Sequence, residues 1–252
     1  MLTRPYISEV ALQTPVDAHS YLAALPIVRY WQEGGRLTFS HPVTFLVGEN
    51  GTGKSTLIEA IAIAAGFNPE GGTRNFRFST NASHSDLWKH LRLSKRDYAE
   101  DGFFLRAESF YNVASHIDEL DRQPAAAPPV IDSYGGVSLH EQSHGESFLA
   151  LVQHRLGGHG LYILDEPEAA LSPMRLLTLL IEMDRLVKAD SQLIIATHSP
   201  ILMAFEGADI WEMSTGGVRR VRYEDTEHYQ VSRRFLNDPA GMLKQLLDDE
   251  ST

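Results

Sequence analysis

A glycine-rich octapeptide at residues 48–55, G-E-N-G-T-G-K-S, holds the residue types and spacing with the clearest chemistry. It fits the pattern G-x-x-x-x-G-K-[ST], whose glycines let successive backbone N–H groups converge on phosphate oxygens. An apolar, β-branched run at 43–47 precedes it, and apolar residues at helical spacing follow at 55–65. A strand followed by a helix aims the helix N-terminus at the same anion, so we predict a nucleoside triphosphate site.

The octapeptide and the residue after it would divide the work of holding ATP. Lys54 would neutralise charge on the β- and γ-phosphates, Ser55 would ligate Mg²⁺, and Thr56 could add a contact from the first helical turn. The other predicted contacts to ATP come from the loop residues Gly48, Glu49, Asn50, Gly51, Thr52 and Gly53. A glycine-rich turn that matches by chance is the alternative, and the flanking strand and helix argue against it.

Two adjacent acids, Asp165 and Glu166, end a second apolar run at 161–164. Asp165 would hold Mg²⁺, and Glu166 would polarise the water that attacks the γ-phosphate. A solvated strand end would also tolerate two acids. Because the same chain carries a phosphate loop upstream, we favour a catalytic role for the pair.

The residues around this acidic pair resemble the Walker B motif and D-loop of ABC-type ATPases. The segment reads D-E-P at 165–167 and A-A-L-S at 169–172, whereas transporter members read D-E-P-x-x-A-L-D. Glu168 and Ser172 depart from the transporter form. The resemblance is therefore to the stand-alone branch of the class, distantly similar to the heads of SMC and recombination-repair ATPases.

A pentapeptide at 143–147, S-H-G-E-S, stands where ABC-type ATPases carry the signature L-S-G-G-Q. Ser143 and Gly145 match that signature, while His144 and Glu146 replace a glycine and the glutamine. The resemblance implies that Ser143 and Gly145 contact the γ-phosphate held by another subunit, so that ATP is sandwiched in a head-to-tail homodimer. An ordinary helix N-cap is the alternative interpretation of Ser143.

Two further features bear on the resemblance. His198, after an apolar run at 193–196, resembles the H-loop histidine, which would contact the γ-phosphate and the attacking water. The glutamine of the Q-loop is missing, because no Gln occurs between Lys54 and Gln123. Glu108 lies where that loop belongs and could replace the glutamine as a contact to Mg²⁺ or water. The alternative is that this coupling is absent.

Composition limits the classes of protein to consider. The 252-residue chain has no cysteine, which excludes disulfides, thiolate metal sites and cysteine nucleophiles. Its net charge of −11 gives no global basic field for nucleic acid. No apolar run approaches the roughly 20 residues that span a bilayer, and residues 1–10 lack a secretory signal, so we expect a cytoplasmic protein without direct membrane insertion.

Unbroken apolar strands that alternate with helices predict an α/β fold with a mainly parallel sheet flanked by helices. We predict strands near 43–47, 162–164, 193–196, 209–213 and 218–223, and helices near 55–65, 85–93, 107–120, 145–156 and 174–187. Two helical segments would end the chain. By the resemblance, residues 1–252 form a single ABC-type P-loop ATPase domain, with 67–138 as an inserted helical or irregular lobe.

Several functions remain open at this point. The first is a soluble, Mg²⁺-dependent ATP hydrolase whose ATP-driven homodimerisation acts as a switch. The alternatives are the ATP-binding subunit of an ABC transporter, a P-loop kinase and a non-catalytic ATP-binding module. A nucleic acid or protein partner is undetermined, although five arginines between 219 and 234 suit a solvated surface better than a nucleic-acid patch. Phe39, Phe76 and Phe78 are candidates for stacking on adenine.

Overall fold

The central sheet has six strands in the order β5-β6-β7-β3-β8-β9, and all neighbours are parallel except the last pair. The computed structural model describes residues 5–74, 84–106, 110–122 and 129–249. The strands of this sheet are β3 (Val43–Gly48), β5 (Asp101–Arg106), β6 (Gly160–Asp165), β7 (Gln192–Ala196), β8 (Asp209–Ser214) and β9 (Gly217–Val221).

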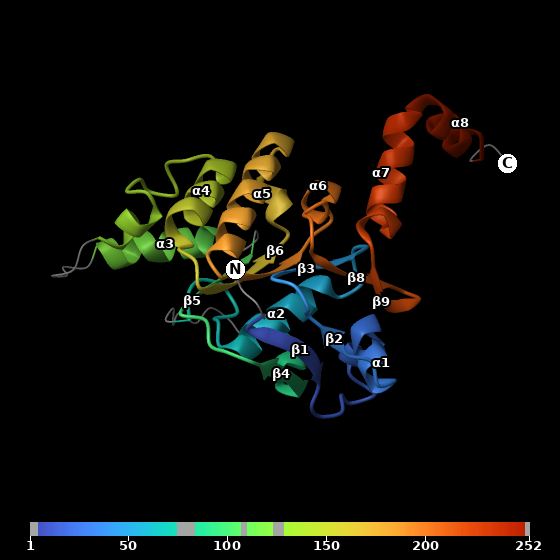
Figure 1. Ribbon diagram of the computed structural model, residues 1–252, viewed down its shortest axis with the longest axis horizontal. Helices are drawn as coiled ribbons and strands as arrows, with labels where there is room; N and C mark the ends of the chain where they lie inside the picture. The colour runs from blue at the N-terminus through green and yellow to red at the C-terminus, as the bar shows by residue number, and fades with distance from the viewer. Residues whose placement is uncertain (1–4, 75–83, 107–109, 123–128, 250–252) are drawn as a thin grey trace.

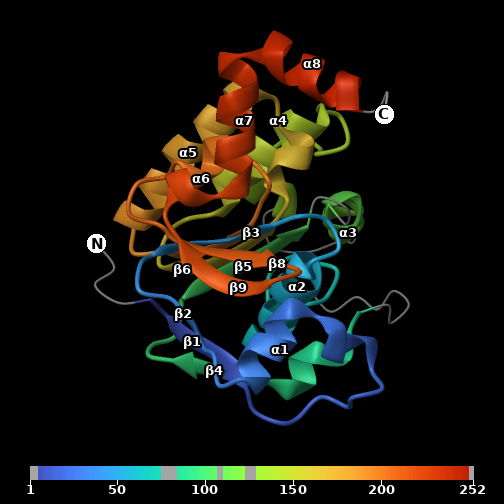
Figure 2. The ribbon, with the colours of Figure 1, turned by 90° about the vertical axis from the view of Figure 1, so that its right-hand side faces the viewer.

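Helices cover both faces of the sheet, as Figures 1 and 2 show. One face carries α3 (Phe110–Asp121), α4 (His144–Ala150), α5 (Pro173–Lys188) and α6 (Pro200–Met203). The opposite face carries α2 (Lys54–Ala65), α1 (Pro26–Gln32) and a small antiparallel sheet of β2 (Leu37–Thr38), β1 (Ile7–Leu12) and β4 (Leu91–Lys95).

The alternation of side chains along β3 explains this division. Val43, Phe45 and Val47 point into the core under α3 to α6, whereas Leu46 joins the core that holds α2 and the small sheet. All four side chains are buried, so neither face of this strand meets water. A parallel strand covered on both sides is necessarily apolar throughout, and this is the pattern that predicts it.

Short helical turns connect these elements. They are 3-10 turns at Tyr21–Ala24, Asp86–His90, Val130–Tyr134, Pro167–Ala170 and Tyr223–Asp225, and a π-helical turn at Leu151–Arg155 that follows α4 directly. At the C-terminal end, α7 (Glu227–Asn237) and α8 (Pro239–Asp249) project from the body of the molecule (Figure 1). Leu236 and Leu247 on this pair are 77% and 63% exposed.

The predicted mainly parallel α/β fold is confirmed, and the make-up of 67–138 needs a correction. This segment was expected to be helical or irregular, yet β4 pairs with β1 in the small sheet and β5 is the edge strand of the central sheet. The expected helix near 85–93 is a 3-10 turn followed by β4. The N-terminal strands and α1 carry no motif, and the sequence did not predict them.

Two observations concern possible partners. Within the described ranges, no helix combines the length and the apolar character needed to cross a bilayer.

Arginines 219, 220 and 222 form ion pairs with acidic neighbours, namely Glu212, Asp209 and Asp225. These pairs satisfy the cations within the chain, which agrees with a solvated surface.

Asp209 fixes the start of β8 through several bonds to one buried carboxylate. Its side chain is fully buried and accepts from the backbone N–H groups of Ser40 (2.6 Å) and His41 (3.1 Å). The His41 ring lies 2.8 Å away, and Arg220 forms an ion pair with the same side chain. A buried carboxylate is tolerated only when such partners surround it.

We expect Asp209→Ala to lower the free energy of unfolding by about 2 kcal/mol, because it removes the carboxylate that ties Ser40, His41 and Arg220 to the start of β8. Urea denaturation followed by circular dichroism measures the loss. Asp225→Ala is the matched control, since it also removes an arginine partner but at an exposed pair, where little change is expected. Equal effects for the two variants would contradict the structural role of Asp209.

Candidate active site

The loop between β3 and α2 forms an open cradle of backbone N–H groups. Gly48 and Gly53 have φ values of 142° and 88°, which L side chains rarely adopt. A Cβ on Gly48 would lie 2.0 Å from the carbonyl oxygen of Met213, so a side chain cannot fit there. No side chain caps the first turn of α2, which leaves its N–H groups available to an anion.

Lys54 crosses this loop with a buried side chain. Its Nζ donates to the carbonyl oxygens of Gly48 (2.8 Å) and Glu49 (2.9 Å). Burial lowers the pKa of Lys54, and the carboxylates of Glu166, Asp165 and Glu168 oppose that shift. An anion in the loop would stabilise the charged amine in the same way, so the cradle is electrostatically matched to phosphate.

A surface hollow lies over this loop. Leu25, from the segment before α1, and Glu166 line this hollow. The other lining residues are predicted ATP contacts, namely Asn50, Gly51, Gly53, Lys54, Ser55 and Thr56. Leu25 lies close to Gly53, since a Cβ on that glycine would come within 2.9 Å of Leu25 Cδ2. Sequence patterns did not point to Leu25, because its contact with the loop depends on how the N-terminal segment packs.

Asp165 ends β6 on the same edge of the sheet. Its side chain is buried and faces Arg106 at the end of β5, with 3.8 Å between Nε and Oδ2. Arg106 also donates to Glu59 of α2 at 2.6 Å. The guanidinium therefore bridges a carboxylate of the cradle helix and the carboxylate predicted to face the metal.

The donor set suits Mg²⁺, which prefers hard oxygen ligands and takes one or two of them from protein. The Ser55 hydroxyl and the Asp165 carboxylate are such donors. Among the described residues, no three acidic or histidine side chains converge on one point that could hold a metal ion. Phosphate oxygens and water would have to complete the shell. The third predicted ligand, Glu108, lies outside the described residues.

Glu166 has a left-handed backbone, with φ 50° and ψ 53°, which is uncommon for a residue with a side chain. Its N–H donates to the carbonyl of Ala196 at the end of β7, which holds the turn in place. The carboxylate is 37% exposed and lies 3.4 Å from Nε2 of His198. Strained residues at a strand end are typical of functional sites, and here the strain turns the carboxylate toward His198.

Glu168 fixes the backbone of the histidine loop. Its carboxylate accepts a hydrogen bond from the backbone N–H of His198. Burial raises the pKa of Glu168, while the His198 N–H and the Thr197 hydroxyl oppose that rise. The sequence analysis noted Glu168 only as a departure from the transporter motif, because nothing in the linear sequence relates it to residue 198.

His198 itself is half-buried at the end of β7. Burial lowers its pKa, the positive charge of Lys54 lowers it further, and Glu166 opposes both effects. A histidine with a lowered pKa is neutral at pH 7, so only one of its two ring nitrogens carries a proton.

The predicted signature residues lie elsewhere. Ser143 caps α4, and its N–H and Oγ both contact Glu146 Oε2, at 3.0 and 2.5 Å. Arg175 of α5 donates to Ser143 Oγ at 3.2 Å and to Glu146 at 3.0 Å. A Cβ on Gly145 would lie 2.3 Å from Arg175 Nη1, so the absence of a side chain there makes room for the guanidinium.

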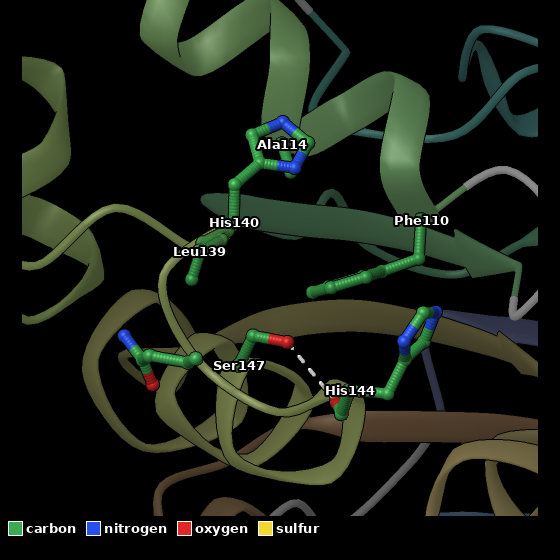
Figure 3. Close-up of a pocket in the computed structure, with 7 residues that line it drawn as sticks. Phe110, Ala114, Leu139, His140, His144 and Ser147 are labelled. Carbon is green, nitrogen blue, oxygen red and sulfur yellow. Dashed lines mark hydrogen bonds between the residues drawn. The ribbon is translucent and has the colours of Figure 1, made fainter.

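The structure thus brings Lys54, Asp165, Glu166 and His198 to one edge of the sheet, but not Ser143 and Gly145. The signature begins α4, on the opposite face of the sheet from α2 (Figure 1). A small pocket lies behind it, where Phe110 of α3 points toward the loop 139–147 (Figure 3). His140 and His144 lie at the margin of this pocket, and Ser147 Oγ donates to the carbonyl of His144 at 3.0 Å.

The expectation for adenine-stacking residues needs a correction. Phe39 is 3% exposed and packs in the core beneath α2, so it is not available to a ligand. Phe76 and Phe78 lie outside the described residues.

Comparisons with known families agree with this geometry. A family model described as "AAA domain" matches residues 28–103, and a second, described as "AAA domain, putative AbiEii toxin, Type IV TA system", matches residues 80–204. A search of curated proteins found no match.

Solved structures with a similar fold include CbiO1 from Clostridium perfringens, described as part of the ABC transporter complex CbiONQ. It shares 17% identity with a TM-score of 0.53, over 97% of this chain and 100% of that one. An ATP-binding cassette of an ABC transporter shares 14% identity with a TM-score of 0.51, over 86% and 91% of the two chains. The SMC head domain from Thermotoga maritima shares 18% identity with a TM-score of 0.43, over 86% and 98%.

This chain has the fold of an ABC-type P-loop ATPase. The ABC-type fold accounts for the order of the motifs along the sheet edge, because β3, β7 and β6 are adjacent and parallel. It supports ATP binding and hydrolysis in general. The roles of individual residues rest on the geometry described above.

We expect Gly48→Ala to lower the unfolding temperature and to abolish ATP binding, because the new methyl group would displace β8 or the loop. Thermal unfolding and binding of a fluorescent ATP analogue measure the two effects. Gly66→Ala is the matched control, since it places a side chain at φ 101° in open space after α2. It should cost only backbone strain, about 1 to 2 kcal/mol, and leave ATP binding intact. Unchanged ATP binding by Gly48→Ala would contradict the cradle.

Proposed function

We propose that this chain is an ATPase that hydrolyses ATP to ADP and phosphate with Mg²⁺ bound. The observation that carries the proposal is the meeting of a buried Lys54, Asp165, and the contact pair of Glu166 and His198 at the edge of the sheet that holds the phosphate loop. The chemistry requires a cation at the phosphates, a metal ligand and a base for water, and the four side chains supply these types.

Each group would act on a different part of the reaction. Lys54 would leave the loop carbonyls for the β- and γ-phosphates. Ser55 and Asp165 would hold Mg²⁺, which supplies positive charge to the phosphate oxygens. Glu166 would accept a proton from the attacking water. The water oxygen would bond to the γ-phosphorus as the bond between that phosphorus and the bridging oxygen breaks, and ADP would leave with the bridging oxygen. His198 would hold the γ-phosphate and that water in line.

We further propose that ATP is shared between two copies of the chain. Ser143 lies exposed at the start of α4, on the far face of the sheet from α2, so it could meet a second subunit rather than its own cradle. Gly145 is buried beneath Arg175, and Arg175 would have to move before that glycine could contact a partner's ATP. In the present arrangement Arg175 and Glu146 occupy the Ser143 hydroxyl. Release of that hydroxyl would accompany formation of the dimer.

We propose that this ATPase is cytoplasmic and that ATP-driven dimerisation makes it a switch. A subunit of a membrane transporter remains the second candidate, on the evidence of fold alone. The two differ in one outcome: co-purification with a membrane protein would favour the transporter subunit, and ATP turnover by the isolated chain would favour the stand-alone enzyme. Transfer of phosphate to an acceptor other than water would indicate a kinase.

We expect Glu166→Gln to reduce ATP hydrolysis by about 100-fold or more while ATP binding persists, because the amide cannot accept the proton of water. Phosphate release and binding of a fluorescent ATP analogue measure the two effects separately. Lys54→Ala is the matched comparison and should lose binding and hydrolysis together. Wild-type turnover by either variant would show that hydrolysis occurs elsewhere or by other groups.

The shared-ATP arrangement has its own test. With ATP and Mg²⁺, Glu166→Gln should elute as a dimer in size exclusion with light scattering, because the uncleaved nucleotide holds the two copies together. The double variant with Ser143→Arg should still bind ATP but remain a monomer. If Glu166→Gln stays monomeric at every ATP concentration, the sandwich is wrong, although the ATPase proposal would stand.

A further inference from the structure

His228, at the first turn of α7, contacts the histidine of the active site. Its Nε2 lies 3.1 Å from Nδ1 of His198, and the two ring centroids are 5.2 Å apart. Both side chains are half-buried. On the other side of the His198 ring, Nε2 faces Glu166 at 3.4 Å. The three side chains therefore form a chain, from α7 through the β7 loop to the residue after β6.

The position of His228 is well anchored. The buried Thr226 caps α7, with its hydroxyl oxygen accepting from the N–H of Tyr229 at 3.3 Å. Glu212 of β8 accepts from the N–H of Glu227 at 3.0 Å and is itself held by Arg219 at 2.6 Å. The first turn of α7 is thus bonded to a strand of the central sheet.

Proton placement distinguishes two arrangements of this chain. If His228 carries its proton on Nε2, it donates to His198 Nδ1, and His198 then carries its proton on Nε2, facing the Glu166 carboxylate. In the opposite arrangement His198 donates from Nδ1, and its bare Nε2 lone pair faces that carboxylate. The opposite arrangement also leaves an N–H at His228 Nδ1, a buried atom with no hydrogen-bond partner in the described part of the chain. In the first arrangement the N–H at His198 Nε2, which has no hydrogen-bond partner in the described residues either, faces a carboxylate oxygen at 3.4 Å. The first arrangement is therefore favoured, because it sets an N–H rather than a lone pair against the carboxylate.

We propose that His228 is a positioning residue that holds the proton of His198 on Nε2, the nitrogen that faces Glu166. The inference rests on the proposed ATPase function, since it assigns a role in that site. A neutral imidazole with its proton on Nε2 can donate from that nitrogen to a phosphate oxygen, whereas in the other tautomer Nε2 can only accept. A second group that fixes the tautomer of a reacting histidine is a recurrent device in enzymes.

The charges around the pair are consistent with two neutral rings. Burial lowers the pKa of His228, and the neighbouring His198 and Lys54 lower it further, while Glu227 and Glu212 oppose the shift. Burial and the charge of Lys54 also lower the pKa of His198, and Glu166 opposes that shift.

Three variants of residue 228 test the proposal. His228→Ala removes the donor and should lower kcat for ATP by about 10-fold with little change in KM. His228→Gln places an amide donor at the same reach and should restore most of kcat. His228→Glu has the size of glutamine but accepts only, so it should not restore kcat. Arg233→Ala, on the exposed side of the same helix, is the control and should behave as wild type.

The tautomer itself can be read without turnover. Long-range ¹H–¹⁵N correlation spectra of the ¹⁵N-histidine-labelled, nucleotide-free protein report which ring nitrogen carries the proton, and His198→Gln identifies the signal among the 11 histidines. We expect the Nε2–H form of His198 in wild type and His228→Gln, and a shift toward Nδ1–H in His228→Glu.

Two results would overturn the inference: an Nδ1–H form of His198 in the wild-type protein, or equal kcat values for His228→Ala, His228→Gln and wild type. An absence of ATP hydrolysis in the wild type would instead reject the proposed function, and the spectra would still decide the tautomer. Thermal unfolding of each variant separates a loss of kcat from a loss of fold.

Discussion

The parallel alignment of β3, β7 and β6 is the constraint on which the site depends. Their registers place Leu46 beside Ala196 and Ala196 beside Asp165, so the three strands end within two residues of each other. Backbone bonds continue this alignment past the strands, from Thr197 to Leu46 and from Glu166 to Ala196. The phosphate loop, the acidic pair and the histidine loop meet because each follows the carboxyl end of one of three adjacent parallel strands.

Charge balance is the second theme of the site. One ammonium group, that of Lys54, is buried near three carboxylates and donates hydrogen bonds to two carbonyl oxygens of the phosphate loop. Burial lowers the pKa of Lys54, and these carboxylates oppose that shift, as a bound triphosphate would. The left-handed turn at Glu166 belongs to the same design, since the strain sets the direction of one carboxylate.

The sequence predicted those site residues that belong to short contiguous motifs. The loop at 48–55, the acids at 165–166 and the histidine at 198 each follow a buried strand, and local pattern was enough to find them. The strands β1, β4 and β5 were missed because polar residues interrupt them and no motif follows them, so local pattern did not separate them from loops. Glu168 and His228 were missed for a related reason: each acts on residue 198, which lies 30 positions away in either direction.

Arg106 has a consequence for how this protein can exist without its ligands. The guanidinium stands between Glu59 and Asp165, so the acidic end of β6 has a resident counter-ion that belongs to the polypeptide. The chain can therefore fold without a divalent ion to balance the charge of Asp165. If a nucleotide binds with Mg²⁺ as proposed, the metal would meet a carboxylate that already has a cation beside it, so binding would rearrange an existing ion pair instead of neutralising a lone charge.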